Sequence, residues 1–185
     1  MEWIILVLVV VVVGWLMVIY NRLVALRQSC GQAWSDVDVQ LKQRHDLIPN
    51  LVETVKGYAT HEKETLERVI AARNAAVAAR TPEEAGQAEG ALAGMLRQVF
   101  ALSEAYPDLK VNQNFLRLQA ELSDIENKIA AARRFFNSAV AEFNASIQQI
   151  PAVFFAGSLG FTPRAFFEVP EDQRAAVQAA PQVKF

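Results

Sequence analysis

The 185-residue sequence has one cysteine, two histidines, eight glycines and seven prolines, and each scarcity excludes a class of protein. A single thiol, Cys30, cannot form an internal disulfide or a cysteine-based zinc site. The formal net charge is −2 and the only adjacent basic pair is Arg133-Arg134, so we expect no nucleic-acid partner. The prolines cluster at segment ends rather than at the spacing of strand turns. This distribution favours an all-α fold.

An apolar run without any charge extends over 18 residues from Trp3 to Tyr20. A membrane-spanning helix needs about 20 apolar residues, with about 17 as the lower limit. A buried core helix would show a polar stripe, and a cleaved signal peptide would begin with basic residues, whereas this chain begins Met1-Glu2. The run therefore predicts an uncleaved transmembrane anchor in contact with the lipid bilayer.

The charges that flank the anchor predict its orientation. No lysine or arginine precedes the run, whereas Arg22 and Arg27 follow it closely. Basic residues favour the cytoplasmic side of a membrane. We therefore expect the N-terminus outside and the bulk of the chain in the cytoplasm.

Beyond the anchor, apolar residues recur at alternating steps of three and four, as in amphipathic and coiled-coil helices. This seam predicts a single rod from the anchor to about Arg80. Pro49 interrupts it because proline has no N–H for the carbonyl of His45, and we expect a structural hinge at His45 and Pro49. The seam consists of Leu23, Leu26, Cys30, Trp34, Val37, Leu41, His45, Ile48, Val52, Val55, Ala59, Glu62, Leu66 and Val69.

Two further helices follow from their start and stop signals. Thr81, Pro82 and Glu84 form a capping-box pattern, which predicts a helix to about Ala105. A structural turn is expected at Tyr106, Pro107 and Asp108. A third helix is expected from Asn112 or Asn114 to Ile150, stopped by Pro151, with apolar positions at Phe115, Leu118, Leu122, Ile125, Ile129, Ala132, Phe136, Ala139, Phe143, Ile147 and Ile150.

Short connections make neighbouring helices antiparallel, so the predicted fold is an up-and-down helical bundle. It would contain three long helices and a short C-terminal helical element within 152–161, resembling a four-helix bundle. The expected organisation is a short N-terminus and anchor at 1–21, the bundle at 22–161, and a C-terminal tail at 162–185 that is ordered to about residue 168.

Candidate catalytic and metal-binding residues are few. His61-Glu62 begins like a zinc-protease motif, but Thr65 stands where the second histidine is required. His45 and His61 would lie about 24 Å apart along one helix, too far to share an ion. We therefore expect no catalytic, metal or cofactor site. His45 has two interpretations: a partly buried histidine hydrogen-bonded to a neighbouring helix, or a pH-sensitive hinge with Pro49.

Three features suggest protein contacts. Gly86, Gly90 and Gly94 leave one helix face almost without side chains, which suits either an outside partner or tight packing within the bundle. A heptad seam can also pack against copies of itself, so a homo-oligomer is one hypothesis. Five phenylalanines would either plug the bundle end or form an exposed binding surface: Phe154, Phe155, Phe161, Phe166 and Phe167.

Four stretches resemble the LemA family of bacterial membrane proteins. They are YNRLVALRQ directly after the anchor, AWSDVDVQLKQRHDLIPNLVETVKGYATHE, LSEAYPDLKVNQNFLRLQAELSDIENKIAAARRFFNSAV and GFTPRAFFE. The resemblance covers most of residues 20–168. It implies an N-terminal helix in the bacterial cell (inner) membrane and an up-and-down helical bundle, and it leaves the biochemical role open.

An anchor, a rigid helical body and the lack of a recognisable active site together favour a non-enzymatic scaffold or adaptor. Such a protein would bind other membrane proteins or copies of itself. The alternative is a membrane-tethered sensor that binds a small ligand between its helices outside the cytoplasm.

Overall fold

The computed structural model describes residues 1–168; the expected tail beyond residue 168 lies outside the described residues. Every regular element in 1–168 is helical, which confirms the all-α prediction. The elements in order are α1 (Glu2–Lys56), α2 (Lys63–Ala78), α3 (Pro82–Ala105), α4 (Pro107–Lys110) and α5 (Gln113–Gln148), then two 3-10 turns, η1 (Ala152–Phe154) and η2 (Gly157–Leu159).

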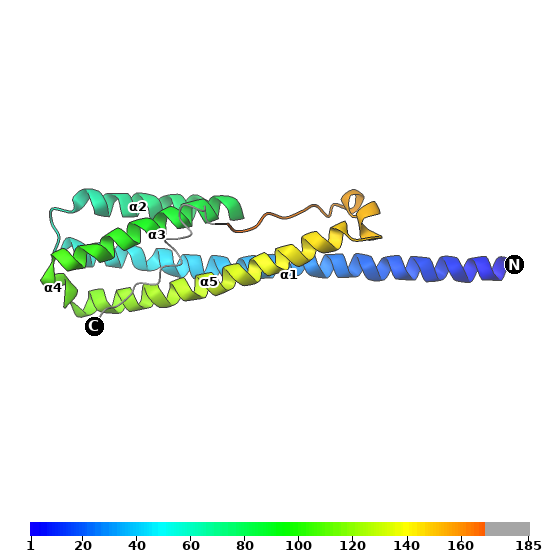
Figure 1. Cartoon of the computed structure of the whole chain (residues 1–185), viewed down its shortest axis with the longest axis horizontal. Helices are drawn as coiled ribbons and strands as arrows, with labels where there is room; N and C mark the ends of the chain where they lie inside the picture. Colours follow the sequence, from blue (N-terminus) through cyan, green and yellow to red (C-terminus); the bar gives the residue numbers. More distant parts are fainter. Residues whose placement is uncertain (169–185) are drawn as a thin grey trace.

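Helix α1 is 55 residues long, about 82 Å at 1.5 Å per residue. Its N-terminal part extends alone beyond the rest of the molecule (Figure 1). The apolar run lies within this part and is long and apolar enough to cross a membrane. Most of its side chains are exposed, and near its end Ile19 packs against the bundle and Tyr20 packs on Phe161. Such exposed apolar side chains are stable when lipid surrounds them.

The prediction of one rod to about Arg80 is wrong, because α1 ends at Lys56 and the chain turns back through residues 57–62. Gly57 follows the last helical residue and favours a break, since glycine loses more backbone freedom in a helix than other residues. Turning back brings Leu66 and Val69 of α2 into the core that contains Ile48 of α1. A straight rod would have left these side chains in water.

Helices α1, α2, α3 and α5 lie side by side with alternating direction (Figure 1). The fourth long helix of the bundle is therefore α2 rather than the short C-terminal element. That element consists of η1 and η2, which lie at the end of α5 nearest the exposed part of α1.

The predicted helix ends are present. Thr81 accepts a hydrogen bond from the N–H of Glu84, whose side chain in turn accepts one from Thr81, so the capping box is complete. The side chain of Asn112 accepts the N–H of Phe115 at 2.9 Å and starts α5. Of the residues of the expected turn, Tyr106 separates α3 from α4, and Pro107 and Asp108 form the first turn of the short α4.

The bundle has two apolar cores in sequence along α1. The anchor-side core contains Leu23 to Leu41 of α1 packed on α5 from Ile125 to Ile147. The distal core contains Ile48 to Val55 with α2, α3 and the start of α5. Between these two cores α1 carries mostly polar residues, including the buried Arg44 and His45, and Leu47 packs against both cores.

Residues 161–168 run back along the bundle as a strap held by two asparagines of α5. Asn144 accepts the N–H of Arg164 and donates to its carbonyl, both at 2.8 Å. Asn137 does the same for Phe167, at 2.9 and 3.1 Å. These asparagines are seven residues apart, so they face the same side of α5. The described part of the expected tail is therefore fastened to the bundle.

Candidate functional site

A buried ion network lies between the two apolar cores. The Arg44 guanidinium donates through one nitrogen to Glu89 and through the other to Glu126, the latter at 2.6 Å. The other carboxylate oxygen of Glu89 lies 2.7 Å from Nε2 of His45. Arg44, His45 and Glu89 are each less than 10% exposed, whereas the Glu126 side chain is 40% exposed.

The network includes the carbonyl that proline leaves free. Pro49 cannot donate to the His45 carbonyl. Arg73 of α2 donates to it instead through Nε, at 3.3 Å. Through Arg44, His45, Arg73, Glu89 and Glu126, the polar contacts therefore join all four long helices at one level. The histidine thus bonds to a neighbouring helix, as the first interpretation of His45 predicts.

Arg44 and Glu89 occupy positions that otherwise carry apolar core residues. Arg44 lies three residues after Leu41 and four before Ile48, both of which are buried. Glu89 lies three residues before the buried Leu92. The helices therefore aim both charges inward because of their register, and each charge is stable only because the other lies opposite.

The pKa values reflect this mutual stabilisation. Burial by itself raises the pKa of Glu89, but hydrogen bonding from His45 and the charge of Arg44 outweigh it and hold the pKa below its ordinary value. Burial opposes the charge of Arg44, yet Glu89 and Glu126 raise its pKa. Both groups are therefore charged at neutral pH. The Nε of Arg44 has no acceptor among the described residues.

This arrangement is suited to fixing helix register rather than to chemistry. Both oxygens of Glu89 and both terminal nitrogens of Arg44 are engaged in contacts, and the remaining Nε of Arg44 is buried, so the pair presents no accessible group to a substrate. Within residues 1–168, no cluster of three His, Cys, Asp or Glu side chains could hold a metal ion. The Sγ of Cys30 donates to the carbonyl of Ala139 at 3.3 Å, and burial raises the pKa of its thiol.

The hinge residues lie inside the continuous α1, since the helix passes through Pro49 and ends at Lys56. His45 is fastened through its ring to α3 and through its carbonyl to α2. Bending of the chain at this point remains a prediction. The second histidine, His61, lies in the turn between α1 and α2.

The candidate glycines face into the molecule. Gly86 and Gly90 are buried and Gly94 is half-buried. The backbone of Glu168 lies so close to Gly86 that there is no room for a Cβ atom. The strap therefore occupies the glycine face at Gly86, in line with the alternative of packing within the bundle.

The five candidate phenylalanines divide into three groups by burial. Phe161 and Phe167 are 2% exposed and belong to the anchor-side core, where Phe167 packs on Trp34 with 5.9 Å between ring centroids. Phe155 and Phe166 are half-buried against the same core. Phe154 is 78% exposed. Two of the five thus plug the bundle, and Phe154 is the member of this set whose ring is mostly exposed to solvent.

Sequence reasoning missed five residues of this site and its surroundings: Arg44, Arg73, Glu89, Glu126 and Asn137. A signal existed for Arg44 and Glu89, since each interrupts an apolar step of three and four with a charge. Opposite charges at core positions of two helices predict a buried pair. No comparable signal marks Arg73 or Asn137, whose backbone partners depend on the tertiary fold.

Comparison with known proteins shows to which protein family the sequence is similar. The sequence profile of the LemA family matches residues 33–185. The chain is 27% identical over 164 residues to Protein LemA of Metamycoplasma hominis, covering 86% of the chain and 74% of that protein. It is 22% identical to Magnetosome protein MamQ of Magnetospirillum gryphiswaldense, covering 80% of the chain and 64% of the relative. For Magnetosome protein MamQ 2 of Paramagnetospirillum magneticum the values are 22%, 86% and 68%. The chain thus spans roughly two thirds to three quarters of these relatives.

Proposed function

The chain belongs to the LemA family, and from this premise we propose that it is a membrane-anchored helical scaffold or adaptor that acts through protein–protein contacts. The observation that carries the proposal is the continuity of α1, which is one helix from the apolar run to the far end of the bundle. A continuous helix transmits position, whereas a flexible linker does not. From Tyr20 to Lys56 the helix rises about 54 Å, so the bundle end is held at a fixed distance from the bilayer.

The buried network supports the same role. Charges that pair only in one register penalise other arrangements of the four helices. A scaffold needs one persistent shape, and Arg44 with Glu89 favours such a shape at the middle of the bundle. The names of the relatives identify no reaction.

The proposed contact surface is the distal tip, which we define as Tyr58, Val111 and Leu116. These residues are 41%, 70% and 42% exposed. They lie together because the amide of Asn112 donates to the Tyr58 hydroxyl at 2.8 Å. Apolar side chains grouped at the end of a rod suit a protein partner. That partner would be another membrane protein or a second copy of the chain, in a bacterial membrane with the bundle in the cytoplasm.

Site-specific photocrosslinking in native membranes tests this proposal. A photoreactive phenylalanine analogue replaces Val111 at the tip or, as the control, Val39, which is 51% exposed on the flank of α1. We expect the tip probe to form one reproducible adduct, with a defined protein or with a second copy, and the flank probe to form none. Equal labelling patterns from both positions would count against a tip-directed scaffold.

A topology measurement distinguishes the scaffold from a sensor outside the cell. In a Cys30→Ala chain, Val111→Cys should react with a membrane-impermeant maleimide only after the cells are broken. Reaction in intact cells would place the bundle outside and favour the sensor.

A further inference from the structure

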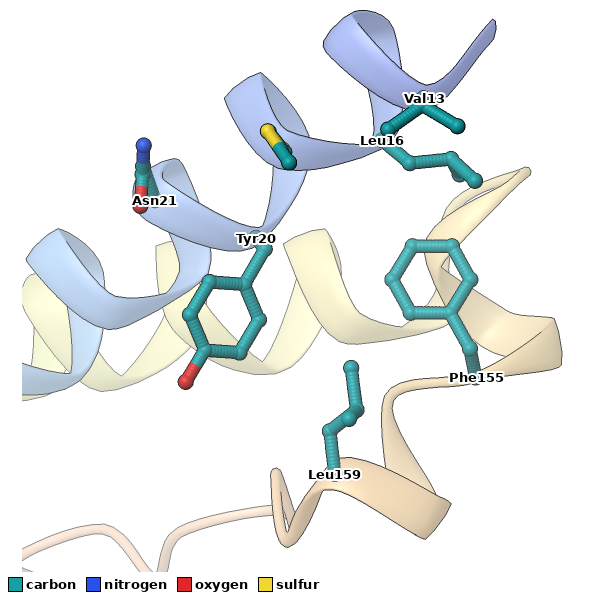
Figure 2. A pocket seen from close by; sticks show the side chains of 7 residues that line it. Val13, Leu16, Tyr20, Asn21, Phe155 and Leu159 are labelled. Carbon is teal, nitrogen blue, oxygen red and sulfur yellow. The ribbon is translucent and has the colours of Figure 1, made fainter. Parts of the chain in front are cut away.

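The segment after α5 lies beside the anchor, at the level where the apolar run ends (Figure 2). We call residues 149–161, which include η1 and η2, the foot. A cavity of about 500 Å³ separates the foot from α1. Its walls are almost wholly apolar and are formed by Val13, Leu16, Met17, Tyr20 and Asn21 of α1 and by Phe155 and Leu159 of the foot. Since Val13 precedes Tyr20 by seven residues, the foot flanks roughly the last 10 Å of the run.

The outer surface of the foot is apolar as well. Ile150 and Phe154 are 79% and 78% exposed, and Val153 is 48% exposed. The sequence carries no charged residue from 143 to 163. An apolar surface of this kind is unfavourable in water and stable in the outer part of a bilayer.

Seven backbone N–H groups of the foot are hydrogen-bonded within the foot, which lowers the free-energy cost of placing them where water is scarce. Non-helical backbone at membrane depth must satisfy its own hydrogen bonds. Within the foot, N–H groups donate to nearby carbonyls at 2.7 to 3.2 Å, and the Ser158 hydroxyl donates to the Phe155 carbonyl at 2.8 Å. These N–H donors are Val153, Phe154, Phe155, Ala156, Leu159, Gly160 and Phe161.

The aromatic contacts of the foot hold it at this level. The Phe161 ring packs edge-on against Tyr20 with 5.7 Å between centroids. The Arg27 guanidinium lies 5.1 Å from the centroid of the same ring. Tyrosine and arginine are both favoured where hydrocarbon meets headgroups. The contact thus aligns the foot with the expected membrane surface.

We propose that the foot inserts into the bilayer beside α1, and that the cavity between them binds an acyl chain of a membrane phospholipid. The occupant comes from the bilayer because one wall of the cavity is the surface of the membrane-spanning run, at Val13, Leu16 and Met17. Arg22 and Arg27 follow the run directly and favour a phospholipid with an anionic headgroup. This contact is separate from the protein contacts proposed for the distal tip.

Spin-label accessibility tests the insertion. In a Cys30→Ala background, a nitroxide is attached to Phe154→Cys or, as the control, to Phe135→Cys, which replaces a phenylalanine that is 58% exposed on α5. Phe135 is next to Phe136, whose ring packs on Trp34, about 21 Å along α1 beyond Tyr20. The full chain is reconstituted in vesicles of phosphatidylethanolamine and phosphatidylglycerol.

The label at 154 should collide mainly with oxygen, which partitions into lipid, and the label at 135 mainly with a water-soluble nickel complex. Equal accessibility of both labels to the nickel complex would overturn the insertion.

A phosphatidylglycerol with a photoactivatable group on its acyl chain tests the cavity in the same vesicles. Adducts are expected on the peptide that contains Phe155 and Leu159. They should fall severalfold with Leu159→Trp, which fills the cavity, and be unchanged with Val39→Trp. Adducts confined to α1, or crosslinks between two chains at the foot, would overturn the assignment of an acyl chain.

Discussion

Removal of the charge on Glu89 should destabilise the bundle more than any removal of a surface charge. In Glu89→Gln, the shape of the side chain is kept while Arg44 loses its buried counter-charge. Breaking a buried ion pair from one side costs about 3–5 kcal/mol. We expect about 3 kcal/mol, because the amide oxygen still accepts a hydrogen bond and Glu126 still pairs with Arg44.

The matched control is Glu64→Gln on α2. Glu64 pairs with Arg68 at 2.9 Å, but the two side chains are 84% and 56% exposed. An exposed pair of this kind contributes about 0–1 kcal/mol. Both variants make the same chemical change to a hydrogen-bonded glutamate, so the difference between them measures the effect of burial.

The assay is urea unfolding of the full chain in a mild detergent, followed by far-UV circular dichroism. The midpoint for Glu89→Gln should fall clearly below those of the wild type and of Glu64→Gln, with similar slopes. Replacing Arg44, His45 and Glu89 together by Met, Leu and Leu should restore most of the stability, since no buried charge is then left unpaired and the carboxylate of Glu126, whose side chain is 40% exposed, can be solvated by water. Equal midpoints for Glu89→Gln and Glu64→Gln would refute the role of the network.

Three further predictions concern acid, packing and the strap. Because the pKa of Glu89 is lowered, the stability that its charge contributes is complete above the ordinary pKa of 4.5 and is lost as the pH falls through the lowered value. The free energy of unfolding should therefore drop more steeply on acidification in the wild type than in Glu89→Gln. Urea unfolding at several pH values measures this difference. Gly86→Ala should cost about 1–3 kcal/mol by urea unfolding because its Cβ would meet the backbone of Glu168, whereas Gly94→Ala should gain roughly 0.5–1 kcal/mol; equal effects would contradict the close approach. Asn137→Ala should cost about 2 kcal/mol and raise amide exchange at Phe167, and unchanged exchange would show that the side chain does not hold the strap.

Most of the fold follows from periodicity and helix signals. Interactions among residues that are close in the sequence determine the all-α class, the capping box at Thr81 and the turn at Tyr106. The break after Lys56 could not be read in this way. Leu66 and Val69 continue the spacing of three and four residues that α1 shows, because α2 packs into the same core after the chain reverses. The spacing alone therefore does not reveal that the helix ends between them and α1.

The candidate site was less predictable than the fold. Charged residues are solvated by default, so the abundance of glutamates concealed Glu89, the one glutamate that is buried within residues 1–168. Its partner Arg44 lies 45 residues away in the sequence, and only the assembly of the whole bundle brings their side chains together. Likewise, Phe161 is buried because it packs against Tyr20 and Arg27 of α1 and against Phe143 of α5, whereas Phe154 is 78% exposed.

The particle mass of the chain, extracted from its own membranes in a mild detergent, tests the scaffold role most directly. The chain alone has a mass of 20.5 kDa. The account predicts a heavier, uniform particle that contains either several copies or one defined partner. Combined Tyr58→Ser and Val111→Ser should reduce it to the single chain, while Val39→Ser and Phe135→Ser should not. A wild-type particle of one chain without a partner, or equal masses for the tip and flank variants, would contradict it.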